Sequence, residues 1–421
     1  MTARTLPALY GEDFAADPER HYAALRQAGP LARVEIAPGV EAMLATDYET
    51  ALDVLRDTHT FGKDPRPWPD TVPADSPVRP VLAYRPAVTF ADGDTHARYR
   101  KVIGDSLALV GPHVLQRQVS TAAAELIGRF AGAGRADLVA DYAQQIPLRV
   151  FSQWFGLPYE EGERLARTHS AMVDLGEDAH AAHEDLTGAI RDLVADRRAR
   201  PQRDLTSYLL QHPAGLDDAE TVRQIAVAFG SGHELTANLV ANTLQHMIAD
   251  PRYDRSVYAG AMTAHEAINE VLWRNPPQAT STGYYVRYDT TFHGVGLRAG
   301  QLVLVSYAAA NTSSRPGGPT TDPWGASESA HLAWGAGPHS CPARQPALLI
   351  AITAIEELTS RLCDMEQTVP AGQLRWRPGP FYRALAALPV RFTPWAPKAP
   401  APPDESGDGA SAGRRGAAVG R

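Results

Sequence analysis

The chain has 421 residues, of which 44% are hydrophobic and 21% are charged, and its formal net charge at pH 7 is −8. This is an ordinary globular composition, and the acidic balance argues against a protein that holds nucleic acid through a basic face. The opening residues are too polar for a signal peptide, and no apolar run reaches the length of a membrane span. We therefore expect a cytoplasmic protein that binds neither nucleic acid nor a membrane.

The first elements in chain order are a helix, a hairpin and an irregular segment. The helix begins near Asp17 and stops at a Gly-Pro pair, and the run after it turns at Pro38-Gly39, which is typical of a β-hairpin. Residues 62–88 are rich in proline and show little periodicity, so we expect an ordered but irregular excursion between helices. Segments of this kind often line binding sites.

Helical patterns dominate from there to about Arg274, and they are interrupted at residues 156–158 and around Pro201. A short alternating run near Leu302 adds a strand. The fold class expected is mainly α with small β-sheets. Residues after Pro394 lack large apolar side chains, which predicts a disordered tail. The division expected is an N-terminal arm at 1–16, one large domain at 17–394 and a tail at 395–421.

A long helix is predicted between Asp217 and Asp250, because Asp217 and Glu220 form a capping box and Pro251 closes the segment. Apolar residues surround almost its whole circumference, so it should run through the core. Small and polar residues interrupt it at its centre, which indicates a ligand lying against it. These residues are Gly230, Gly232, His233, Glu234 and Thr236.

The most informative segment surrounds Cys341, one of only two cysteines. Gly335 and Gly337 precede it in a turn-like loop, His339 lies two residues before it, and a helical pattern follows. A helix N-terminus presents free N–H groups and a positive dipole end, both of which favour a thiolate that could bind a soft metal. Cys363, near the far end of that helix, has no such loop and is interpreted as structural. With only two cysteines in the chain, we do not expect disulfide bonds to stabilise the fold.

The segment WGAGPHSCPA resembles the cysteine loop of cytochromes P-450, usually Phe-Gly-x-Gly-x-His/Arg-x-Cys-x-Gly. Trp334 replaces the usual Phe, and Ala343 replaces the last Gly. The resemblance implies a haem-binding domain in which Cys341 is the axial iron ligand and His339 contacts a haem propionate.

A second segment, DGDTHARYRKVI, resembles the family's Asp-x-x-x-His-x-Arg-x-Arg helix. His96 and Arg100 occupy its propionate-binding positions. They are four residues apart, so they share one helix face and can grip two neighbouring carboxylates. Without the cysteine loop, the same pattern would describe a solvated basic face.

The long helix resembles the family's oxygen-binding groove, commonly Ala-Gly-x-Glu/Asp-Thr. Glu234 stands at the acid position, but Leu235 stands at the threonine position, and the nearest hydroxyl belongs to Thr236. The resemblance makes Glu234 and Thr236 the candidate catalytic residues. It also implies a set of cofactor-binding residues: His96, Arg100, Gly232, Trp334, Gly335, Gly337 and His339.

Two further positions depart from the family pattern. The helix that usually carries Glu-x-x-Arg reads Glu270-Val-Leu-Trp273, so we expect Glu270 to find another donor or to be solvated. Tyr284 stands where a propionate arginine is usual, with Arg287 nearby.

The resemblance implies a haem b monooxygenase that uses O2 to oxidise a small molecule of secondary metabolism, with electrons from a ferredoxin and its reductase. Substrate choice is expected to rest with residues 66–88, 152–200 and those after Pro277. Two alternatives stay open: oxidative coupling of aromatic groups in a peptide or cyclic dipeptide, and a haem-binding regulatory protein with little turnover. A zinc site is disfavoured because the short ligand pairs it needs are missing.

Overall fold

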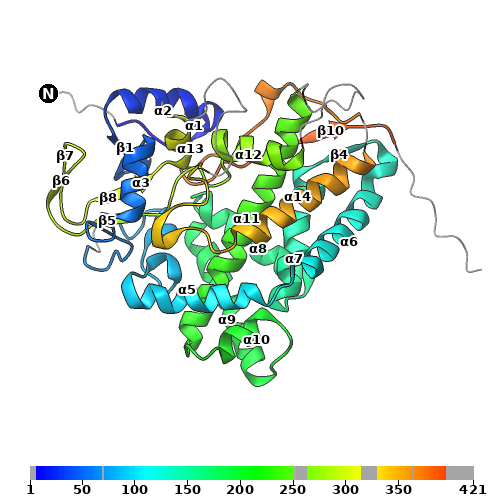
Figure 1. Cartoon of the computed structure of the whole chain (residues 1–421), viewed down its shortest axis with the longest axis horizontal. Helices are drawn as coiled ribbons and strands as arrows, with labels where there is room; N and C mark the ends of the chain where they lie inside the picture. The colour runs from blue at the N-terminus through cyan, green and yellow to red at the C-terminus, as the bar shows by residue number, and fades with distance from the viewer. Residues whose placement is uncertain are drawn as a thin grey trace, which may run out of the picture.

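The structure, a computed structural model, describes residues 6–68, 71–250, 252, 263–313, 330–362 and 364–394. Within these residues the fold is mainly helical, with three small sheets at its margins (Figure 1). The predicted class, mainly α with small β-sheets, is confirmed.

The helices and strands have the following bounds. The helices are α1 (Glu12–Ala16), α2 (Pro18–Gln27), α3 (Tyr48–Arg56), α4 (Arg79–Leu82), α5 (Gly93–Ala108), α6 (Pro112–Phe130), α7 (Gln145–Phe155), α8 (Tyr159–Val173), α9 (Ala179–Ala199), α10 (Leu205–Gln211), α11 (Asp218–Ala249), α12 (Ala264–Arg274), α13 (Tyr307–Asn311) and α14 (Arg344–Arg361). The strands are β1 (Leu31–Ala37), β2 (Val40–Ala45), β3 (Phe61–Gly62), β4 (Arg135–Asp137), β5 (Tyr284–Val286), β6 (Thr290–Phe292), β7 (Val295–Leu297), β8 (Leu302–Val305), β9 (Glu366–Gln367) and β10 (Pro389–Arg391).

The largest sheet has the strand order β1-β2-β8-β5-β3. Strands β1 and β2 form the predicted hairpin, which turns at Pro38-Gly39, where Gly39 has a φ of 73°. Strand β8 is buried on both faces and pairs parallel to β2. Successive side chains of a strand point to opposite faces, so β8 contributes Leu302 and Leu304 to one apolar cluster and Val303 and Val305 to another.

Helix α11 is the central element, and it runs through the middle of the molecule beside α14 (Figure 1). The predicted capping box is present, because the Asp217 side chain accepts from the Glu220 N–H at 2.7 Å and Glu220 accepts from the Asp217 N–H at 3.1 Å. The helix is buried over most of its length. The prediction of a long core helix is confirmed.

The proline-rich segment is mostly irregular, as predicted, but it contains the short helix α4, which was not expected. Pro80 stands in the first turn of α4, where its fixed φ suits a helix and its missing N–H costs nothing. The segment is fastened to α11 by Gln224, which accepts from the Val88 N–H and donates to the Pro86 carbonyl, both at 3.1 Å. Its last residues therefore lie over the N-terminal half of α11.

The described part of the N-terminal residues lies on the sheet. Leu9 is fully buried, its N–H donates to the Glu35 carbonyl at 2.8 Å, and Glu35 donates to the Pro7 carbonyl at 2.9 Å. The predicted tail at 395–421 and Cys363 lie outside the described residues. Among the described helices, we find none with the length and apolarity that crossing a membrane requires.

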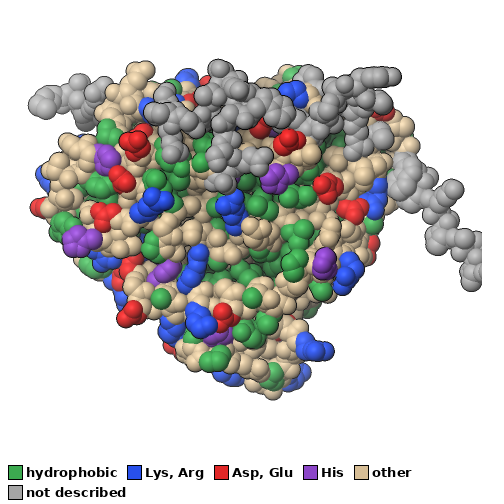
Figure 2. Space-filling view, in the orientation of Figure 1, with side chains coloured by type: hydrophobic (Ala, Val, Ile, Leu, Met, Phe, Trp, Pro, Cys, Tyr) green, Lys and Arg blue, Asp and Glu red, His purple; other side chains and the backbone are tan. Residues whose placement is uncertain are grey.

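The surface mixes charges of both signs. On the face shown in Figure 2, Lys and Arg side chains alternate with Asp and Glu side chains, and hydrophobic side chains lie between them. This agrees with a chain whose net charge is small for its length.

Candidate active site

Cys341 lies at the junction of a tight loop and helix α14, as predicted. The short 3₁₀ turn Gly337–His339 precedes it, the Cys341 N–H donates to the Trp334 carbonyl at 2.8 Å, and α14 begins three residues later at Arg344. The thiol side chain is part-exposed in the middle of an otherwise packed region. The loop backbone thus presents one sulfur atom at a fixed place.

The two loop glycines are needed for the path of the chain. Gly335 has a φ of +69° and Gly337 a φ of +66°, a region that other residues rarely adopt. A Cβ on Gly337 would lie 2.4 Å from the Leu55 carbonyl oxygen at the end of α3. The absence of a side chain at Gly337 therefore allows the cysteine loop to approach the end of α3 closely.

The charge state of Cys341 differs from the sequence expectation. Burial raises the pKa of the thiol, and the Ala343 N–H, Arg100 and Arg344 oppose that rise without overcoming it. The helix N-terminus therefore does not make a stable thiolate by itself. A metal cation at the sulfur would supply the missing stabilisation, because a coordinating thiol is deprotonated outright.

Cationic side chains gather beside Cys341. The rings of His96 and His339 have centroids 4.2 Å apart, and an Arg100 Nη2 donates to the Ser340 hydroxyl at 3.4 Å. Burial, followed by the charges of Lys63, His96 and Arg100, lowers the pKa of His339 to about 2. The His96 Nε2 is buried without a hydrogen-bond partner among the described residues.

This cluster, made of Lys63, His96, Arg100 and His339, fits a ligand with negative charge. The carboxylate in reach is Asp92, 4.0 Å from His339, and Asp92 also pairs with Arg287 at 2.8 Å. One acid shared in this way leaves an excess of buried donors. A flat cofactor with two carboxylates and a metal that takes a thiolate matches both the cluster and Cys341.

Lys63 is a member of this cluster that the sequence reasoning missed. Its ammonium donates to the Thr282 carbonyl at 3.2 Å and the Gly283 carbonyl at 3.0 Å, and lies 3.6 Å from the centre of the Tyr284 ring. Burial lowers the pKa of Lys63 to about 7. The one signal in the sequence was rarity, since the chain contains only three lysines. A cation from the proline-rich segment thus lies over Tyr284, where the family usually has arginine.

Glu234 in α11 is held by partners from distant segments. Arg377 donates to its Oε1, Asn238 donates to the same oxygen at 3.2 Å, and Ser170 donates to Oε2. Burial alone would raise the pKa of Glu234, but Arg377 and other partners lower it to about 2. Arg377, which sequence reasoning missed, also pairs with Asp174 at 2.6 Å. Glu234 is therefore an ionised, fully engaged carboxylate at neutral pH.

The small residues of α11 have a packing role. A Cβ on Gly230 would clash with the His169 ring, and one on Gly232 would meet the Phe151 ring of α7 at 2.9 Å. Thr236 follows Gly232 by four residues, so it shares the face turned toward α7. Among the described residues, the side chains that hydrogen-bond to Glu234 are Ser170, Asn238 and Arg377, and Thr236 is not one of them. The interruption that suggested a ligand is explained here by the neighbouring helices.

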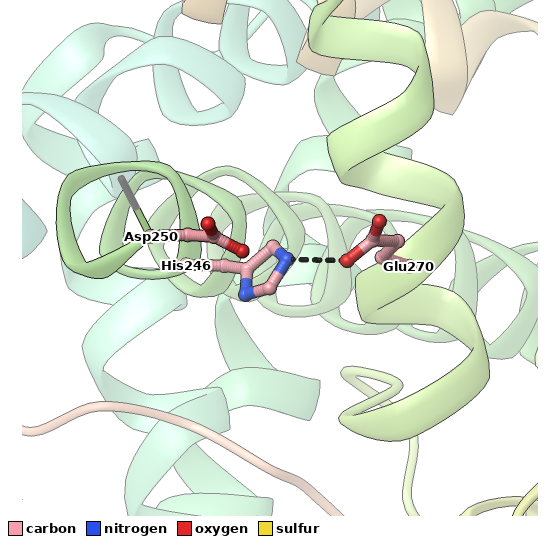
Figure 3. A group of neighbouring side chains, drawn as sticks. All are labelled: His246, Asp250 and Glu270. Carbon is pink, nitrogen blue, oxygen red and sulfur yellow. Dashed lines mark hydrogen bonds and ion pairs between the residues drawn. The ribbon is translucent and has the colours of Figure 1, made fainter. Parts of the chain in front are cut away.

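Glu270 finds other donors, as the sequence predicted. His246 contacts its Oε2 at 2.9 Å (Figure 3). Arg252 donates to Oε1 at 3.1 Å and to Oε2 at 2.9 Å. Arg252 also pairs with Asp250. The guanidinium therefore supplies the positive charge for both carboxylates of this group.

Trp273 fills the place of the family's arginine with a neutral contact. The indole is buried and packs edge-on against the His331 ring, with centroids 5.8 Å apart and planes at 84°. Burial lowers the pKa of His331 to about 4, so this imidazole is neutral. An aromatic pair thus joins α12 to the segment before the cysteine loop where an ion pair is usual.

Restoring arginine at this position should be harmful. Trp273→Arg would bury a guanidinium without its usual partner, because Glu270, which pairs with arginine in the family pattern, contacts His246 and Arg252 in this protein. We expect a loss of about 3–5 kcal/mol in the free energy of unfolding, measured by urea denaturation. The matched control Trp273→Phe keeps a ring on His331 and should cost about 1.5 kcal/mol or less. Equal stability of Trp273→Arg and the wild type would contradict this account.

The fold and the site together describe a helical protein whose cysteine loop and basic side chains would fit a flat metal cofactor with two carboxylates. Comparison with known proteins agrees with that class. The chain is 30% identical over 408 residues to nocardicin C N-oxygenase of Nocardia uniformis subsp. tsuyamanensis, covering 91% of this chain and 98% of that protein. It is 29% identical over 391 residues to the cytochrome P-450 monooxygenase PikC of Streptomyces venezuelae, covering 91% and 92%.

Solved structures give the same result. The crystal structure of the myxobacterial cytochrome P-450 CYP267B1, in complex with myristic acid, superposes with a TM-score of 0.80 at 25% identity, covering 91% of this chain and 98% of that one. No family model matches the sequence. The chain belongs to the cytochrome P-450 family and is a monooxygenase whose cofactor is haem iron.

Proposed function

We propose that this chain uses haem b, bound through the Cys341 sulfur, to oxidise a small organic molecule of secondary metabolism. The observation that carries the proposal is the part-exposed Cys341 thiol beside a cluster of basic side chains that share one acid, Asp92. Haem supplies both counterparts, because its iron takes a thiolate and its propionates take cations. His96, Arg100 and His339 would hold the propionates, with Lys63 adding positive charge.

When bound, the haem supplies oxygen activation, which no protein side chain provides. The protein would bind the haem and would tune its electron density through the sulfur ligand. The Cys341 sulfur would hold the metal and supply electron density to it, and the loop hydrogen bond from the Cys341 N–H to the Trp334 carbonyl fixes the backbone that carries the sulfur. Trp334 and Gly335 complete the cysteine loop, with Trp334 packed against the main apolar core.

Glu234 and Thr236 stay predictions as catalytic residues. The position of Glu234 supports a role in orienting the Ser170 hydroxyl, because an ionised carboxylate accepts hydrogen bonds but does not release a proton. Proton delivery through Glu234 would need its Arg377 contact to loosen. Thr236 lies on the α7-facing side of the helix, which favours a packing role.

The electron donors proposed are a ferredoxin and its reductase. The sequence contains no strand followed by Gly-x-Gly-x-x-Gly that would bind a flavin or nicotinamide in the same chain. One relative is named as the N-oxygenase of nocardicin C, and one solved structure holds myristic acid, which supports a small organic molecule as the substrate.

The test is the spectrum of the reduced, haem-loaded protein with carbon monoxide, followed by oxygen consumption with a surrogate ferredoxin. A Soret band at about 450 nm is expected for a thiolate ligand. A band near about 420 nm would show that the thiolate is lost or protonated and would favour the regulatory alternative. Failure to bind haem at all would overturn the proposal.

A further inference from the structure

Two part-buried arginines, Arg85 and Arg223, lie where the proline-rich segment covers the N-terminal half of α11. Arg85 belongs to the proline-rich segment between α4 and the turn Val88–Phe90, and Arg223 belongs to α11. The Gln224 hydrogen bonds to Pro86 and Val88 fix the Arg85 loop on this part of the helix. The two guanidinium groups are close enough that Arg223 lowers the pKa of Arg85.

Neither arginine has an acidic partner among the described residues. Arg85 donates to the carbonyls of Pro80 and Val81 and lies 4.9 Å from the Phe90 ring centre. Arg223 donates to the Thr187 hydroxyl at 2.7 Å and contacts the His183 Nε2 at 3.3 Å. All of these contacts are neutral. Burial, with Arg223 as the further cause, lowers the pKa of Arg85 to about 9.

The side chains around the pair add more donors. Burial, Arg85 and Arg223 lower the pKa of His183 to about 4, and its Nδ1 is buried without a partner. Arg191 of α9 adds a further positive charge beside Arg223. On the α8 side, His169 also has a buried, unpartnered Nδ1. The nearest acid it feels is Glu234, which is already bound to Arg377.

An excess of this kind is costly in an empty protein, because a buried charge needs an opposite charge or strong hydrogen bonds. A guanidinium provides a planar pair of donors that matches a carboxylate or phosphate. Four elements contribute side chains to the cluster around Arg85 and Arg223: the proline-rich segment, α8, α9 and α11. Residues 66–88 and 152–200, to which the sequence assigned substrate choice, meet at this cluster.

We infer that the substrate is an organic anion whose acidic group binds between Arg85 and Arg223, with His183 as an additional donor. This rests on the proposed function, since it names the substrate class of that enzyme. The acidic group would sit at the N-terminal half of α11. The rest of the substrate would extend along α11 toward Ser231 and Leu235, which are part-exposed although most of their neighbours in the helix are buried.

The test compares three probes that share one alkyl chain: decanoate, decyl phosphate and neutral decanamide. Their dissociation constants for the full-length, haem-loaded protein are measured by calorimetric titration. The variants are Arg85→Met and Arg223→Met, which keep length and remove charge. The control is Arg198→Met, because Arg198 lies in α9 but is half-exposed and paired with Asp218.

We expect decanoate or decyl phosphate to bind the wild type at least about tenfold more tightly than decanamide. The tighter of the two identifies the acidic group as a carboxylate or a phosphate. Arg85→Met and Arg223→Met should each remove that preference while changing decanamide binding less than about threefold, and Arg198→Met should retain it. Equal binding of anion and amide by the wild type, or an equal loss of both in the variants, would overturn the inference.

A second measurement guards against a merely structural role. Without ligand, Arg85→Met should melt at the same temperature as the wild type or higher, since it removes an uncompensated charge. A clear drop in melting temperature would instead show that the fold requires the guanidinium. This inference and the proposed function can fail separately. If the protein gives the carbon monoxide band of a thiolate ligand but does not prefer anions, only this inference is overturned. If it prefers anions but does not give that band, only the proposed monooxygenase function is overturned.

Discussion

Replacing Cys341 with serine should shift the carbon monoxide band of the reduced, haem-loaded protein from about 450 nm to about 420 nm. Serine has nearly the same size, but its oxygen is a harder, less acidic ligand that binds haem iron poorly. Oxygen-dependent turnover with a surrogate ferredoxin should fall by at least about 100-fold, since losing even an outer partner of a metal ligand costs up to that factor.

The matched control for this substitution is Cys363→Ser, which removes the other thiol of the chain. It should keep the band and the turnover of the wild type. If Cys341→Ser kept the band while Cys363→Ser lost it, the assignment of the iron ligand would be wrong.

Replacing Arg377 with methionine should destabilise the protein by about 3–5 kcal/mol, because it leaves the Glu234 carboxylate buried without its cation. Asp174 loses the same partner, although it is more exposed. The measurement is urea denaturation at neutral pH. The double variant Glu234→Gln with Arg377→Met should recover a large part of the loss, since an amide tolerates burial better than an unpaired carboxylate.

The same pair predicts how stability depends on pH. The pKa of Glu234 is about 2 in the folded protein, below its ordinary value of 4.5. Its stabilising contribution is therefore fully present above about pH 4.5 and is lost as the pH falls toward 2. The variant Glu234→Gln should have a shallower loss of stability over that window. An unchanged acid profile would show that Glu234 is not held as the geometry indicates.

Sequence patterns were sufficient where a signal depends on neighbours within a few residues. The hairpin at Pro38-Gly39 and the capping box at Asp217 and Glu220 formed where they were predicted. The cysteine loop was found for the same reason, because two glycines at positive φ and a following helix leave a local pattern. Short range also explains why α4 was missed, since its single turn is too short to give a periodic signal.

Local patterns were insufficient for the partners of charged side chains. The sequence gives no reason to join Glu234 to Arg377, 143 residues away, and none to place the Lys63 ammonium on the Gly283 carbonyl, 220 residues away. It suggested that a helix N-terminus would ionise Cys341, whereas the depth of burial raises the pKa of that thiol.

The sequence by itself determined the family, the mainly helical fold class, the first hairpin and the long core helix, while the role of Cys341 stays a proposal. The tertiary structure alone decided which charges are compensated: Glu234 by Arg377, Glu270 by Arg252, and Arg85 and Arg223 by no acid among the described residues. The physical reason is range. Turns, caps and helix periodicity are set by adjacent backbone, while the energy of a buried charge depends on whichever distant side chains the packed fold brings beside it.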